Sequence, residues 1–102
     1  MAHDDIPASW ARTGDTLTRT IQCADFVEAL ALTLEIGRLA EKANHHPDIS
    51  LHDYRKLDIT LCSHDAGRTV TDKDLSLARQ INGVSEDAIR STKENLQQRF
   101  SA

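Results

Sequence analysis

One long helical pattern, from residue 26 to about residue 44, constrains the fold of this chain more than any other feature of its sequence. Asp25 is a typical N-cap residue, and Glu28 three positions later completes a capping-box pattern. Pro47 disfavours helical backbone at the residue before it, so the helix must end nearby. The sequence therefore predicts a helix of about five turns, which needs another layer to cover its apolar side.

This helix has two chemically different sides when its residues are placed at 100° steps. The polar side carries Glu28, Glu35, Arg38 and Lys42. The apolar side, which we expect to face the core, carries Phe26, Ala29, Leu30, Leu34, Ile36 and Ala40, with Thr33 and Gly37 near its centre. Glu41 falls on the core side, one turn before His45.

Alternating apolar and polar residues predict two strands before the helix and two after it. The first pair is a short strand over residues 9–12, which carries Trp10, and a strand from Thr16. The second pair is a short strand over residues 49–52 and a longer one over residues 54–63. In the longer strand Leu57, Ile59 and Leu61 form the buried face, while Tyr54 and Cys62 lie on the other face.

Two further helices complete the chain. Thr71 and Asp74 form a capping box that begins a helix ending at Asn82-Gly83, and Ser85 caps a last helix with a thin apolar stripe. The order β-β-α-β-β-α-α predicts an α+β fold, in which a four-stranded antiparallel sheet has helices packed on one face. The other face is left for a ligand or another subunit. We divide the chain into a flexible lead (1–8), one domain (9–83) and an additional C-terminal helix packed on that domain (84–102).

Composition excludes several classes of function. The net charge is −4 and basic residues do not cluster, so we expect no direct binding of nucleic acid. No apolar run is long enough to span a membrane, and the acidic N-terminus is not a signal peptide. Two distant cysteines are most simply reduced thiols of a cytoplasmic protein.

Three histidines within twenty residues are the candidate chemistry: His45, His46 and His64. Imidazole exchanges protons near neutral pH, so acid–base catalysis is one interpretation. Surface or capping histidines are another. A zinc site is the weakest, because adjacent histidines at a helix end seldom converge on one ion and no further ligand pattern is present. We assign His3 and His52 to structural roles.

The pattern Glu41-x-x-x-His45-His46-Pro47, followed by Tyr54 and His64, resembles the pterin-4a-carbinolamine dehydratases. Trp10, the Asp25-Phe26 helix start and the segments 61–67 and 71–78 also look like that family. The resemblance covers residues 10 to 82, and the predicted order of elements agrees with the family's fold.

The resemblance implies a dehydration that needs no metal and no other cofactor. A 4a-hydroxytetrahydropterin loses water to give the quinonoid dihydropterin, which is the recycling step after hydroxylation of an aromatic amino acid. By similarity, His45 and His64 would transfer protons at the 4a-carbon and N5. His46 would hold the pterin and share the acid–base work, and Glu41 would orient the histidines. The sequence does not assign the acid and the base.

Other positions have a structural interpretation beside the functional one. Asp74 matches an aspartate of the family but also closes a capping box, and we favour the structural role. Trp10 and Tyr54 would line the pocket or belong to the core. Arg68 follows Gly67 where the family commonly has a second glycine, in a loop one residue longer, and would clamp the pterin or crowd it.

The sequence thus predicts a cytoplasmic homodimer or homotetramer that binds a pterin. The alternative is a dehydratase-like protein with little or no activity that serves as a scaffold or assembly partner. A metal or small-molecule binder that uses the same histidines is a third, weaker hypothesis.

Overall fold

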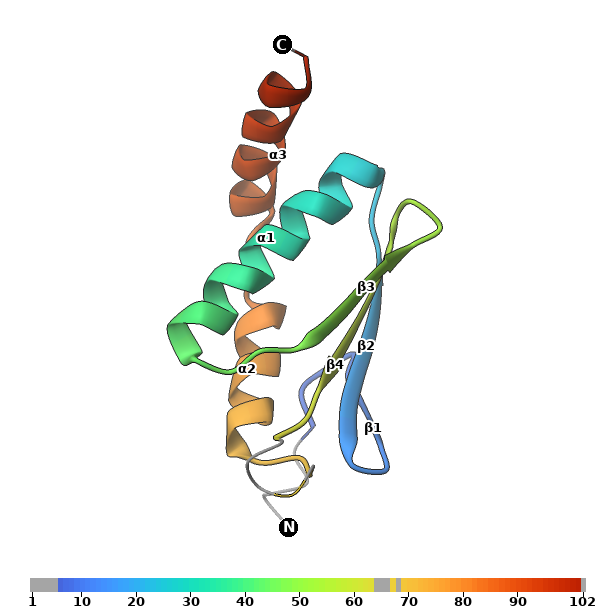
Figure 1. Ribbon diagram of the computed structural model, residues 1–102, viewed down its shortest axis with the longest axis vertical. Coiled ribbons are helices and arrows are strands. Elements are labelled where there is room, and N and C mark those ends of the chain that lie inside the picture. Colours follow the sequence, from blue (N-terminus) through green and yellow to red (C-terminus); the bar gives the residue numbers. More distant parts are fainter. Residues whose placement is uncertain (1–5, 64–66, 68, 102) are drawn as a thin grey trace.

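The computed structural model has four strands and three helices in the predicted order (Figure 1). It describes residues 6–63, 67 and 69–101. The elements are β1 (Ala11–Thr13), β2 (Thr16–Gln22), α1 (Phe26–Ala43), β3 (Asp48–His52), β4 (Lys56–Leu61), α2 (Asp72–Asn82) and α3 (Glu86–Phe100). None of the helices in these residues is long and apolar enough to cross a membrane. The predicted α+β class is confirmed.

The strands form one antiparallel sheet in the order β1-β2-β4-β3. Leu17 of β2 pairs with Leu61 of β4, and Ile49 of β3 pairs with Ile59 of β4. Because side chains alternate along a strand, this register gathers the apolar side chains on the face that the helices cover. The opposite face is polar and carries Thr16, Thr18, Thr20, Asp58 and Thr60.

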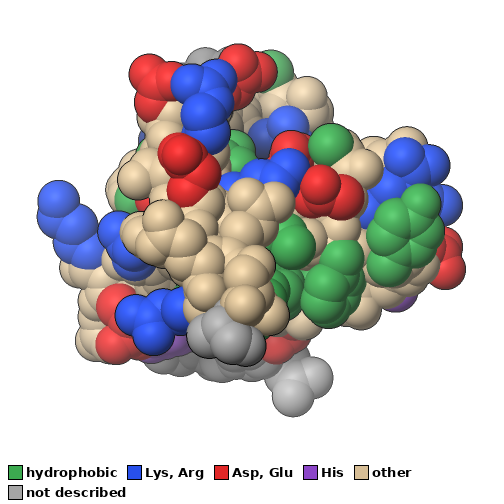
Figure 2. Space-filling view, turned by 90° about the horizontal axis from the view of Figure 1, so that it is seen from above, with side chains coloured by type: hydrophobic (Ala, Val, Ile, Leu, Met, Phe, Trp, Pro, Cys, Tyr) green, Lys and Arg blue, Asp and Glu red, His purple; other side chains and the backbone are tan. Residues whose placement is uncertain are grey.

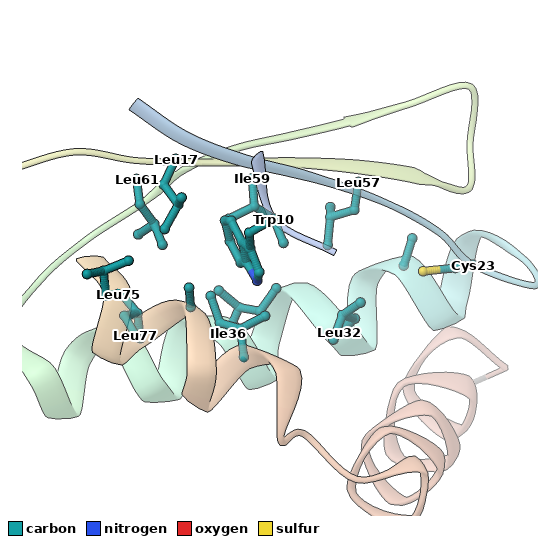
Figure 3. Close-up of a cluster of buried hydrophobic side chains, with 13 residues drawn as sticks. Trp10, Leu17, Cys23, Leu32, Ile36, Leu57, Ile59, Leu61, Leu75 and Leu77 are labelled. Carbon is teal, nitrogen blue, oxygen red and sulfur yellow. The ribbon is translucent and has the colours of Figure 1, made fainter. Parts of the chain in front are cut away.

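A cluster of buried side chains fills the space between the sheet and helices α1 and α2 (Figure 3). Leu17, Leu57, Ile59 and Leu61 from the sheet are fully buried there. Burying an aliphatic side chain of this size contributes about 1.5–3 kcal/mol. The cluster is therefore the main source of stability, and it fixes α1 and α2 relative to the strand ends.

Helix α1 turns a different side toward the core from the one we expected. Its buried residues are Ala29, Ala31, Leu32, Ile36 and Ala40. Phe26 and Leu34, which we expected in the core, are 46% and 47% exposed. That expectation is wrong because the apolar arc of the helix is wider than the surface that the sheet covers. The pattern gives the width of the arc but not the part of it that meets the sheet.

Capping explains where the helices begin. The backbone N–H of Glu28 donates to Asp25 at 2.8 Å, as predicted, but the Glu28 carboxylate accepts from the backbone N–H of Ala24 instead of Asp25. In α2 the predicted box is present, since the backbone N–H of Thr71 donates to Asp74 at 2.8 Å.

Trp10 precedes the first strand instead of lying within it, because β1 begins at Ala11. Its ring enters the middle of the buried cluster (Figure 3). The indole Nε1 donates to Asn82 Oδ1 at 2.9 Å, and Asn82 Nδ2 donates to the carbonyl of Ala8. The N-terminal segment is thereby tied to the C-terminal end of α2. Residues 1–5 of the predicted flexible lead lie outside the described residues.

Tyr54 also lies outside the strand that we predicted for it. Asp53 and Tyr54 both have left-handed backbone, with φ of 50° and 52°, and they turn the chain between β3 and β4. The Tyr54 side chain is 61% exposed. The guanidinium carbon of Arg55 lies 5.7 Å from the centre of its ring. The tight turn delays the start of β4 to Lys56.

Helix α3 packs on α1, on the side away from the sheet (Figure 3). The Thr92 hydroxyl donates to Glu35 at 2.7 Å, so Glu35, which we expected on the solvent side, keeps only 12% of its side chain exposed. Lys93 Nζ donates to Asp25 at 2.9 Å. Polar contacts supplement a thin apolar stripe, whose last residue Phe100 is 61% exposed.

The contact between Lys93 and Asp25 predicts a pH-dependent link between α3 and α1. Hydrogen bonds from the Lys93 ammonium and the Glu28 N–H lower the pKa of the Asp25 carboxyl. A carboxyl with a lowered folded-state pKa stabilises the fold above its unfolded pKa of about 4, and this contribution disappears as the pH falls through the folded-state pKa. We expect Lys93→Met to lower the free energy of unfolding in urea at pH 7, and the difference from wild type to shrink at pH 3. Lys42→Met is the control, and equal losses in both variants would contradict the link.

Candidate functional site

The turn after α1 places His45 against the first turn of α2. Asn44 ends the helix in the left-handed conformation, with φ of 50°, and the backbone N–H of His45 donates to the carbonyl of Ala40. His45 Nε2 then lies 2.6 Å from Asp74 Oδ1. The His45 side chain is 11% exposed and the Asp74 side chain is completely buried.

Asp74 is the centre of a buried hydrogen-bond network. Its Oδ2 accepts from the Ser63 hydroxyl at 2.8 Å and from the backbone N–H of Thr71 at 2.8 Å. The hydroxyls of Ser63 and Thr71 lie 2.6 Å apart. One oxygen of Asp74 therefore closes the capping box that the sequence predicted for α2, and the other faces His45.

His46 has a different environment from its neighbour. Its Nε2 lies 2.5 Å from Glu41 Oε2, and the two side chains are 57% and 78% exposed. Glu41 thus contacts a histidine, but our expectation that it lies on the core side of the helix is wrong. The rotation of α1 that exposes Phe26 and Leu34 also turns this carboxylate to the surface.

Some of the predicted site residues are not brought to His45. Trp10 forms a hydrogen bond with the C-terminal end of α2, whereas His45 contacts the first turn of that helix. Tyr54 follows β3, at the end of that strand distant from His46; five strand residues span roughly 16 Å. Pro47 directly follows the two histidines, between them and β3. His64 and Arg68 lie outside the described residues.

Ser63 and Thr71 are members of the network that our sequence analysis did not single out as site residues. The alternation of Leu57, Ile59 and Leu61 on the buried face of β4 could have identified Ser63, since it continues the same series. Ser63 is 1% exposed. A serine in such a position needs a hydrogen-bond partner inside the fold, and Asp74 supplies it.

A shallow pocket of about 330 Å³ opens beside His45. It is lined by Ala43, His45, Asp72, Lys73, Ser76, Leu77 and Gln80. Helix α2 provides most of the polar groups of this pocket, so a small polar molecule there could reach the His45 ring.

His52 makes a second pairing with a carboxylate, on the polar face of the sheet. Its Nε2 lies 2.8 Å from Asp58 Oδ2, and the Thr20 hydroxyl donates to Asp58 Oδ1 at 2.7 Å. The hydrogen bond from Thr20, with a smaller effect of His52, lowers the pKa of Asp58. His45 and His46 thus each face one carboxylate, and His52 faces two, because its Nδ1 also lies 3.6 Å from Asp53 Oδ2. Within residues 6–63, 67 and 69–101, no three histidine, cysteine or acidic side chains are grouped to hold a metal ion.

Comparison with known proteins places this chain in a family. Residues 2–84 match the family described as pterin 4 alpha carbinolamine dehydratase. A protein of Nocardia farcinica named "Putative pterin-4-alpha-carbinolamine dehydratase" is 43% identical over 84 residues, which are 82% of this chain and 85% of that protein. A protein of the same name from Thermomicrobium roseum is 42% identical over 77 residues, covering 76% of this chain and 80% of the relative.

Two solved structures share the fold. The transcriptional coactivator/pterin dehydratase of Brucella melitensis has a TM-score of 0.67 and 30% sequence identity, over 80% of this chain and 83% of that one. A pterin dehydratase-like protein described as a RuBisCO assembly factor of the alpha-carboxysome has a TM-score of 0.61, over 74% of this chain and 87% of that one. At 18% identity the second likeness concerns the fold alone. The family match over residues 2–84 and the sequence relatives show that the chain belongs to the pterin-4a-carbinolamine dehydratase family.

Proposed function

We propose that this protein is a cytoplasmic enzyme that dehydrates 4a-hydroxytetrahydropterins to quinonoid dihydropterins. The observation that carries the proposal is the contact between His45 and the buried Asp74, in a chain whose sequence belongs to this family. The pocket beside His45 supports it, because it gives a small polar substrate access to the imidazole.

The reaction needs a proton at one atom and the loss of a proton at another. Hydroxide is a poor leaving group, so an acid must protonate the 4a-oxygen before it departs as water. A base must take the proton from N5 as the double bond between C4a and N5 forms. Atoms and charges balance without an oxidant or a metal ion. Two imidazoles in opposite protonation states suit this chemistry near neutral pH.

We assign the proton transfers to His45 and His64, and substrate holding to His46. His45 is supported by its fixed orientation against Asp74, and His64 by the family motif. The pair of His46 and Glu41 is exposed, which suits a group that contacts an incoming ring and shares the acid–base work. Arg68 departs from the second glycine that is common in the family, and we propose that it clamps the pterin or crowds it.

A second candidate function is a dehydratase-like protein that binds a partner protein and catalyses little. The observation in its favour is the apolar stripe of α1, formed by Phe26, Leu30 and Leu34, because Phe26 and Leu34 are nearly half exposed. Exposed apolar stripes on helices commonly mark contact surfaces. The rate assay below separates the two functions.

We further propose that the apolar stripe is covered by α1 of a second copy in a homo-oligomer. A two-fold contact brings the same surface of both copies together, so Phe26 and Leu34 of each copy would be covered by the other copy. Hydrophobic side chains lie among charged groups at the end of the molecule seen in Figure 2.

Gly37 supports close packing of a second helix. Within the described structure a Cβ at Gly37 would meet nothing within 4 Å, so packing in this chain does not require a glycine there. Glycine inside a helix costs about 1 kcal/mol relative to alanine. Close approach of a second helix at this point would explain why the position has no side chain.

The enzyme proposal predicts a specific loss of activity. We expect wild-type protein to accelerate the decay of a freshly generated 4a-hydroxytetrahydropterin, followed by ultraviolet absorbance, and His45→Ala to lower kcat/KM about a hundredfold or more. His52→Ala is the matched control, since it removes a histidine paired with a carboxylate on the opposite face of the sheet. A wild-type rate equal to the spontaneous rate would contradict the enzyme and favour the partner-binding function.

The oligomer proposal predicts a change of mass. Light scattering after gel filtration should give wild-type protein at least twice the chain mass of 11.3 kDa. Leu34→Glu should shift the protein to the monomer, because it places like charges in an apolar contact. Phe100→Ser removes an exposed aromatic side chain from the tip of α3 and should leave the mass unchanged. A monomeric wild type at all concentrations tested would refute the contact.

A further inference from the structure

We propose that Ser63 is a positioning residue, which acts through Asp74 to hold the His45 ring in a single tautomer. Ser63 lies just beyond β4 and is 1% exposed, so solvent does not compete for its hydroxyl. Its backbone N–H donates to the carbonyl of Thr69, which fixes the serine at the base of the loop before α2. The expected effect of Ser63 on catalysis rests on the proposed function, whereas its expected effect on the tautomer of the His45 ring does not.

The direction of each hydrogen bond in the network follows from the carboxylate. An ionised carboxylate only accepts, so the Ser63 hydroxyl must donate to Asp74 Oδ2. The single hydroxyl proton of Ser63 is then used, and in the 2.6 Å contact between the two hydroxyls Thr71 is the donor. The chain therefore runs in one direction, from the Thr71 hydroxyl through Ser63 to Asp74.

The two oxygens of Asp74 are thereby given separate tasks. Oδ2 accepts from Ser63 and from the backbone N–H of Thr71, each at 2.8 Å, and the Thr71 hydroxyl lies farther away at 3.5 Å. The two shorter hydrogen bonds fix the plane of the carboxylate. Oδ1 faces the His45 ring and lies 2.6 Å from its Nε2. Without the Ser63 hydroxyl, Oδ2 would keep the backbone donor but lose the one that holds it toward β4.

The fixed carboxylate determines which ring nitrogen carries the proton. Because Asp74 only accepts, neutral His45 must hold its proton on Nε2, and Nδ1 keeps the lone pair. Within the described part of the chain, Nδ1 has no hydrogen-bond partner. Nδ1 is therefore the atom of His45 that can exchange a proton with a substrate, and Ser63 contributes to that assignment without touching the substrate.

Nitrogen NMR of the imidazole rings tests the inference directly. In wild-type protein we expect neutral His45 to give a pyrrole-type Nε2 and a pyridine-type Nδ1 resonance. In Ser63→Ala the two signals should move toward each other as the second tautomer becomes populated, while Ser63→Thr, which restores the hydroxyl, should restore the wild-type pattern. Ser50→Ala, on the exposed edge strand β3, is the matched control.

Kinetics gives a second readout. Partners that orient a functional histidine are typically worth roughly tenfold or more in activity, so kcat/KM of Ser63→Ala should fall by about that factor and recover in Ser63→Thr. A purely structural serine would lower the melting temperature of the alanine variant but leave the ring signals of the folded protein unchanged, and that result would overturn the inference.

The wild-type spectrum can refute the inference even where Ser63→Ala does not fold. If neutral His45 in wild-type protein carries its proton on Nδ1, the inference is wrong whatever the variants do. If the tautomer is as expected and Ser63→Ala redistributes it, but wild-type protein does not accelerate the dehydration, the positioning role stands and the proposed function fails.

Discussion

The buried carboxylate of Asp74 is the interaction on which the arrangement of the candidate site depends. Three parts of the chain contact it: the segment after β4 through Ser63, the start of α2 through Thr71, and the turn after α1, 29 residues away, through His45. A buried carboxylate is costly unless each oxygen is hydrogen-bonded, so these segments are held together for an electrostatic reason as well as by the apolar core. The same contacts that satisfy the charge fix His45.

Much of the fold could be predicted from the sequence, because periodicity and capping are local properties. The strands with Leu57, Ile59 and Leu61 on one face, and the capping box at Thr71, follow from residues within a few positions of one another. The side of α1 that faces the core could not be predicted in the same way. It depends on how much surface the sheet offers and on α3, which contacts Glu35 from more than fifty residues away.

The candidate site was predictable in its residue types but not in all of its contacts. The motif identified Glu41, His45 and His46, yet it did not reveal that His45 is enclosed and His46 exposed, because that difference arises from the turn at Asn44. For Trp10 and Tyr54 the sequence could not distinguish a place in the pocket from a place in the core. An aromatic side chain suits a pocket and a core equally well, and only its tertiary partners distinguish the two.

The contrast between the adjacent histidines gives the site its chemical asymmetry. Both rings face a carboxylate, but Asp74 is buried and held by other donors, whereas Glu41 is on a surface where water competes for it. A carboxylate that cannot rotate fixes the ring opposite it, and one that can rotate lets its partner adjust to a ligand. The proposed elimination needs one precisely oriented proton donor or acceptor and one group that can reach the ring as it enters and leaves. The enclosed His45 suits the first task and the exposed His46 suits the second.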